Sequence, residues 1–159
     1  MVKVIWGSLQ QLAFIRIIII MLNKIYLEFS DTYRHAEYVV LSSSPIVFKI
    51  DEHCAELDEL MARCGVSVAS FITACNPKGL AQSDGENLLV MNQLQSAIDD
   101  LRLPYFKGFG RDPKGAWKED SYLIMGIELD QACQLGHLFE QNAIVMLARN
   151  MVPKLVWMN

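Results

Sequence analysis

Short apolar runs alternate with amphipathic helical stretches along most of this chain, and that alternation limits the folds open to it. The strand-like and helical segments follow the order β-β-α-β-α-β-β-α-β-β. Such an order is typical of an α+β fold, in which helices cover one sheet. We therefore predict a single mixed β-sheet covered by about three helices, packed in two layers or, alternatively, in three.

Local start signals place the helices. Asp51 precedes a stretch whose apolar residues recur every three or four positions, which predicts an N-terminal cap and a helix. Ser83 and Glu86 have the spacing of a capping box. Asp130 is expected to cap the third helix. The predicted helices span residues 51–64, 83–101 and 130–141.

The strands are predicted from β-branched and aromatic runs bounded by turn-forming residues. The first two strands are separated by a serine- and proline-rich turn, which indicates a hairpin. The loop at 110–120 is rich in turn formers. The predicted strands are 37–41, 46–50, 66–74, 105–109, 122–127, 143–148 and 155–158.

The first 22 residues form an apolar leader that is distinct from the rest. Sixteen of them are apolar, but Gln10, Gln11 and Arg16 interrupt the run, so it is shorter than a membrane span requires. Three interpretations stay open: Met21 is the true start, the leader packs as an extra strand or helix, or it anchors the protein to a membrane. We divide the chain into this leader at 1–22, which under the first interpretation is foreign to the native protein, and one α+β domain at 23–159.

Composition excludes several classes of function. A chain of 159 residues supports one hydrophobic core. The net charge of −4 and the pI near 5.3 give no overall attraction to nucleic acids or anionic membranes. The four cysteines show no C-x-x-C pair, as expected for reduced thiols in a cytoplasmic protein.

Sequence motifs for common chemistries are missing. The three histidines form no zinc-binding pattern, and there is no G-x-S-x-G elbow or phosphate-binding loop. The segment 107–110 matches the opening of an RNA-recognition motif, but the aromatic residues that should follow are replaced at 111–114. We predict no metal, no cofactor and no nucleic-acid partner, which leaves an unknown small molecule or protein.

The segment 70–77 is an apolar strand that runs into a polar corner and stops at proline. Polar residues at strand ends and helix starts meet at the rim of a sheet in many ligand sites. An Asn/Gln/Thr set suits recognition of an amide, a base edge or a sugar, with a glutamate as general base. The predicted site comprises Thr73, Asn76, Asn87, Ser121, Gln141 and Asn142 for binding, with Glu119 as the catalytic candidate.

A structural explanation for the same residues is weighed equally. In that interpretation Asn76 caps a turn before Pro77, Asn87 and Gln141 bind loop backbone, and Glu119 pairs with Arg111 or Lys118.

Five short segments together resemble a bacterial family known as domain of unknown function 3293. They are Tyr33-x-x-Ala36-x-Tyr38 and the segments 72–77, 86–87, 117–122 and 139–144. The resemblance covers about 31–157, and the chain departs from the family pattern at Cys75, Asp120 and Glu140, where Trp, Glu and Gly are usual. It implies domain limits and no activity.

Three functions remain. The first is a small binding or regulatory module that holds a nucleotide-like or amide-containing ligand, for which a pocket should join Thr73, Asn76, Asn87 and Gln141. The second is a hydrolase or transferase, for which Glu119 should be buried with a raised pKa. The third is a protein-interaction domain with no pocket and an exposed apolar patch.

Overall fold

The computed structural model describes residues 2–158, with the backbone alone described at residues 2–10, 18 and 21–23. This range contains one seven-stranded sheet. The helices are α1 (Val2–His35), α2 (Ala55–Arg63), α3 (Asp84–Leu101), α4 (Leu129–Leu138) and the 3₁₀ turn η1 (Pro77–Gly79). The strands are β1 (Glu37–Val40), β2 (Ile46–Phe48), β3 (Val68–Ile72), β4 (Tyr105–Arg111), β5 (Lys118–Met125), β6 (Ala143–Ala148) and β7 (Lys154–Trp157).

The predicted α+β class and element order are confirmed, with α1 added at the start. The sheet order is β2-β1-β4-β5-β3-β6-β7, and the sheet curls into a half-barrel. Every neighbouring pair is antiparallel, which corrects the predicted mixed sheet. The helical connections do join strands of the same direction, such as β3 and β4. However, β5 lies between these two strands and separates them.

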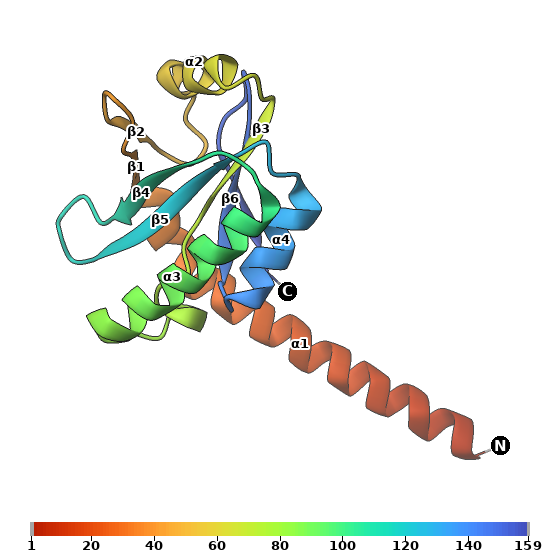
Figure 1. Ribbon diagram of the computed structural model, residues 1–159. Coiled ribbons are helices and arrows are strands. Elements are labelled where there is room, and N and C mark those ends of the chain that lie inside the picture. Colours follow the sequence, from red (N-terminus) through yellow and green to blue (C-terminus); the bar gives the residue numbers. More distant parts are fainter. Residues whose placement is uncertain (1, 159) are drawn as a thin grey trace.

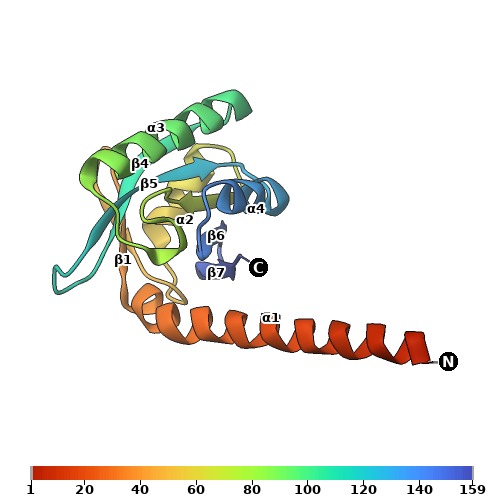
Figure 2. The same ribbon diagram turned by 90° about the horizontal axis from the view of Figure 1, so that it is seen from below.

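Helices cover both faces of the sheet, as Figure 1 shows for α3 and α4 on one face and α2 at the top. Alternate strand residues enter different cores: Leu123 packs with the α2 residues Leu60 and Met61, whereas Ile124 packs with Leu94 of α3. Seen from below, α1 passes beneath the body on the side away from α3 and α4 (Figure 2). The three-layer alternative therefore describes the arrangement better than two layers.

Local helix signals succeed at α3 and fail at the other two predicted helices. The capping box of Ser83 and Glu86 is confirmed, with both reciprocal hydrogen bonds present. The cap of α2 is Cys54 rather than Asp51, and the cap of α4 is Glu128 rather than Asp130. Asp51 does not cap α2 because it has a left-handed backbone (φ 62°) and its carboxylate is held by distant residues.

Strand β5 begins at Lys118, four residues before the predicted start at Tyr122. Its first half is polar, and pairing with β4 extends it, so that Arg111 lies opposite Lys118 and Gly110 opposite Glu119. The predicted loop at 110–120 is correspondingly shorter. This extension carries Glu119 into the sheet instead of leaving it on a loop.

Helix α1 contains the predicted leader. Its segment 11–20 leaves the body (Figure 1) and exposes apolar side chains such as Phe14 (66%) and Ile20 (66%). In the described part of the chain, no helix has the length and apolar character needed to cross a membrane. The division into a leader and a domain at 23–159 stays a prediction.

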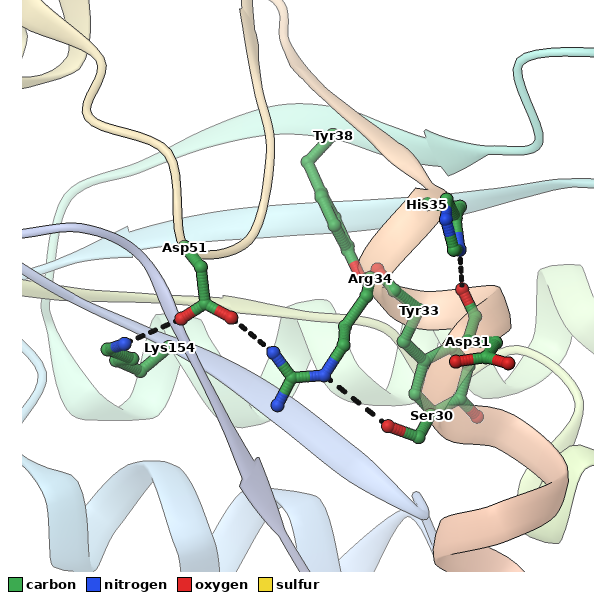
Figure 3. A network of polar contacts seen from close by, with 8 residues as sticks. All are labelled: Ser30, Asp31, Tyr33, Arg34, His35, Tyr38, Asp51 and Lys154. Carbon is green, nitrogen blue, oxygen red and sulfur yellow. Dashed lines mark hydrogen bonds and ion pairs between the residues drawn. The ribbon is translucent and has the colours of Figure 1, made fainter.

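Aromatic stacking and ion pairs attach the last turns of α1 to the sheet. Tyr33 stacks on Trp157 of β7, with ring centroids 5.7 Å apart. Asp51 accepts hydrogen bonds from Arg34 of α1 and, at 2.6 Å, from Lys154 of β7 (Figure 3). These contacts hold the end of α1, and with it Tyr33, against the edge strand β7.

Candidate functional site

A cavity of about 50 Å³ lies between the last turns of α1 and the sheet. Four of the predicted site residues line it: Thr73, Glu119, Ser121 and Gln141. Aromatic side chains complete the wall, contributed by Tyr33, Tyr38, Phe71 and Trp117. The structure therefore brings together residues that lie up to 122 positions apart in the sequence, from Tyr33 to Leu155.

Strand β5 and the residue just before it supply three lining residues, because side chains alternate along an extended chain. Trp117, Glu119 and Ser121 face the cavity. Gly110 on the opposite strand lies against two of the cavity rings: a Cβ there would be in ordinary van der Waals contact, 3.5 Å from the Trp117 ring and 3.8 Å from Tyr38. Gly110 and both rings therefore belong to the same part of the cavity wall as Glu119.

Asn76 fixes one side of that carboxylate. Its Nδ2 donates a hydrogen bond of 2.7 Å to Glu119 Oε1. Its Oδ1 accepts from the backbone N–H of Gln82 (2.9 Å) and from Asn87 Nδ2 (3.0 Å). Since the oxygen is already used by two donors, the NH₂ group has to point toward Glu119. The orientation of the Asn76 amide is therefore set by its neighbours.

The backbone of Asn76 explains why asparagine occupies the corner. Its φ of 48° and ψ of 59° are left-handed, a conformation that asparagine adopts more easily than most residues. Its N–H donates to Asn87 Oδ1 at 2.9 Å. Asn87 at the start of α3 therefore fixes Asn76, and Asn76 in turn fixes the Glu119 carboxylate.

The other polar lining groups use their donors within the protein. Thr73 donates to the Asp120 carbonyl (2.7 Å) and Ser121 to the Glu119 carbonyl (3.3 Å). Gln141 Nε2 donates to the carbonyls of Cys75 (3.2 Å) and Phe139 (3.1 Å). What these side chains have left for a ligand is mainly acceptor capacity.

Burial raises the pKa of Glu119, and the hydrogen bond from Asn76 opposes that shift only in part. Among the described residues, no lysine, arginine or histidine forms an ion pair with Glu119. Arg111 pairs with Glu37 at 2.8 Å, and Lys118 Nζ lies 4.2 Å from the centroid of the Phe109 ring. The expected pairing of Glu119 with Arg111 or Lys118 is therefore absent.

Three predicted residues do not line the cavity: Asn76, Asn87 and Asn142. Asn87 borders a separate hollow of about 330 Å³ together with Cys75, Lys118 and Asp120. Asn142 is buried and its Nδ2 lies 3.5 Å from the Tyr33 hydroxyl. Asn87 bonds to Asn76, which in turn binds the lining residue Glu119, and Asn142 lies against the lining residue Tyr33. All three therefore support the cavity wall from behind.

The aromatic lining was not among the predicted site residues. Tyr33 lies in the last turns of α1 and Tyr38 in β1, and the Tyr38 hydroxyl donates to the Tyr33 carbonyl at 2.8 Å. Trp117 could have been found from its spacing, because it alternates with Glu119 and Ser121. The tyrosines had no local signal beyond their place in the resemblance.

No three His, Cys, Asp or Glu side chains in the described part of the chain are grouped so as to hold a metal ion. The candidate site consists instead of one carboxylate, its amide support and a ring-lined wall.

Comparison with known proteins identifies a family over part of the chain. Residues 72–144 match the family described as Protein of unknown function (DUF3293), which confirms the resemblance within that segment. The matched segment contains all of the predicted site residues, from Thr73 to Asn142. No curated protein and no solved structure matches the chain.

Proposed function

We propose that this chain, which carries a DUF3293 domain over residues 72–144, is a small binding module whose cavity holds a compact hydrogen-bond-donating group. The observation that supports this function is the state of Glu119: one carboxylate oxygen is fixed by Asn76, and the side chain lines a cavity. A cytoplasmic location, as the cysteines suggest, is part of this proposal.

The size of the cavity narrows the ligand. About 50 Å³ gives room for roughly four water molecules, whereas sites for whole drug-sized ligands occupy some 300–1,000 Å³. A nucleotide therefore does not fit inside, and an amide or amine end of a larger molecule does. The amide-containing ligand is favoured over the nucleotide-like one.

The hydrogen-bonding inventory favours the same choice. The side-chain donors of Thr73, Ser121 and Gln141 are satisfied by backbone carbonyls. A carboxylate accepts hydrogen bonds and cannot donate them. A ligand that brings N–H donors complements this wall, whereas a ligand that brings only acceptors does not.

A thermal-shift screen of the full chain tests the proposal with small amides, amines, sugars and nucleosides. Binding at ten times the Kd adds about 1.4 kcal/mol to the unfolding free energy, which raises Tm by roughly 3–5 °C. We expect amides or amines to do this in the wild type and not in Glu119→Gln.

Asp120→Asn is the matched control, because Asp120 is the next residue on β5, is exposed and is not among the cavity-lining residues. It should respond as the wild type does. Stabilisation by sugars or nucleosides alone, or equal responses in Glu119→Gln, would contradict the proposal.

The second candidate is a hydrolase or transferase in which Glu119 is the general base. Its specific support is the raised pKa of Glu119, which brings a carboxyl closer to the pH at which general bases work. Incubating each stabilising amide with the protein and following it by ¹H NMR distinguishes the two. Turnover that Glu119→Gln abolishes indicates the enzyme, and an unchanged ligand indicates binding alone.

The interaction-domain alternative called for a surface with no pocket. The cavity beside Glu119 makes it the least supported of the three, although the exposed apolar segment 11–20 fits its other requirement.

A further inference from the structure

We infer that the ligand group held in this cavity is a cation, an ammonium or guanidinium group, rather than a neutral amide. This inference rests on the proposed function and specifies the chemical class of its ligand. Three features of the site carry it: a carboxylate without a counter-charge, a wall of aromatic rings and a cavity of matching size.

The missing counter-charge is the first feature. Charged side chains that are withdrawn from water are normally paired. In the described part of the chain, each cation near the corner already has another contact. Lys78 pairs with Glu140 (2.7 Å), Arg111 pairs with Glu37, and Lys118 lies over Phe109. No described side chain supplies a positive charge to Glu119, so we expect that charge to come from a ligand.

The other titratable groups around the cavity do not compete for this role. Glu119 interacts electrostatically with Tyr33 of α1, Tyr38 of β1 and Cys75 of the corner. Burial raises the pKa of each of these three groups, so all are neutral near pH 7. The ionised cavity therefore carries a single charge, which is negative.

The aromatic wall is the second feature. Tyr33, Tyr38, Phe71 and Trp117 line the cavity with Glu119. Ring faces carry partial negative charge and attract organic cations, and the attraction grows when the cation is desolvated. A neutral amide gains less from such a wall. Rings and carboxylate therefore favour the same kind of ligand.

The dimensions are the third feature. Room for roughly four water molecules matches an ammonium or guanidinium head group, with its N–H donors close to the carboxylate. Asn76 already occupies Oε1 of Glu119, so the ligand is expected to contact chiefly the other oxygen. The rest of a longer molecule would lie outside the cavity.

A matched pair of probes tests the charge directly. Methylguanidinium and methylurea have nearly the same shape and similar N–H donors, and they differ in charge. Each is titrated into the ¹⁵N-labelled full chain, and binding is followed at the indole N–H resonance of Trp117, assigned with Trp117→Phe. We expect the wild type to bind methylguanidinium at least 10-fold more tightly than methylurea.

The variants locate the origin of that preference. Glu119→Gln should reduce the ratio of the two affinities to about one, and Asp120→Asn should leave it unchanged. If Glu119→Gln does not fold, the wild-type ratio and its decline between 50 and 500 mM NaCl still decide the question, because salt screens only the charged pair.

Two results would overturn the inference in distinguishable ways. Equal binding of methylguanidinium and methylurea by the wild type would contradict the cation and leave the proposed donor-binding function standing. Binding of neither probe, with no stabilisation by any amide or amine, would overturn the proposed function as well.

Discussion

Asp51 and Glu119 both lie beside the last turn of α1, and the fold treats their carboxylates in opposite ways. Asp51 is 38% exposed and contacts two cations, Arg34 and Lys154. Glu119 is partly buried, and no cation among the described residues pairs with it. The first carboxylate holds elements together, and the second lines a cavity.

The pKa values follow this difference. The hydrogen bond from Lys154 is the largest cause that lowers the pKa of Asp51, with a further contribution from Arg34. Burial raises the pKa of Glu119. A carboxylate that joins structural elements is paired with cations of the same protein. A carboxylate that binds a ligand has no such partner in the free protein. The contrast is what marks Glu119 as the functional candidate.

The largest effect is expected from removing the amide that supports Glu119. Asn76→Ala removes the donor to Glu119 and the acceptor for Gln82 and Asn87, and it places alanine in a left-handed backbone. We expect a loss of about 2–4 kcal/mol in the unfolding free energy, measured by urea denaturation.

Asn76→Gly is the control for that variant, because glycine adopts the left-handed conformation without strain. It should recover about 1 kcal/mol and leave the greater part of the loss. A glycine variant as stable as the wild type would show that the hydrogen bonds around Asn76 contribute nothing.

A smaller effect is expected in how the unfolding free energy depends on pH, where Asp51 and Glu119 contribute with opposite signs. The lowered pKa of Asp51 means that its stabilising contribution is present above its ordinary pKa of 3.8 and is lost as the pH falls through the lowered value. The raised pKa of Glu119 has the opposite sign. Its contribution is present below the ordinary pKa of 4.5 and is lost as the pH rises through the raised value.

Urea denaturation of the wild type and of variants that lack each charge, at pH values from 2 to 8, measures the sign of both contributions to the unfolding free energy. Asp51→Asn should be less stable than the wild type above pH 3.8, by about 1 kcal/mol or less for so exposed a pair. Glu119→Gln should gain stability relative to the wild type as the pH rises above 4.5, by a free energy on the order of 1 kcal/mol. Parallel profiles for the two variants would refute the contrast.

Local sequence signals predict the helices and strands and the polar half of the cavity lining, but not its aromatic half. The capping box at Ser83 and the alternation of strand residues depend on neighbours within a few positions, so the sequence reveals them. The same holds for the corner, where proline ends the apolar strand. Glu119 is predicted as a site residue only from the chemistry of its carboxylate, because the sequence predicts a loop at a position that lies in β5.

What the sequence concealed depends on distant partners. The sequence predicts Asp51 to be a helix cap, yet its carboxylate pairs with Arg34 and Lys154, which are 17 and 103 positions away. The antiparallel pairing follows from β5 lying between β3 and β4, which no local pattern encodes. Tyr33 and Tyr38 line the cavity because the end of α1 packs against strands that are distant in the sequence, such as β7.

A ¹³C NMR titration of the side-chain carboxyl groups tests the central contrast most directly, because it reports both pKa values in one sample. A midpoint above 4.5 for Glu119 and below 3.8 for Asp51 is the predicted result. A Glu119 midpoint at or below 4.5 would mean that the carboxylate is solvated or already paired, and would contradict its assignment as the charge that awaits a ligand.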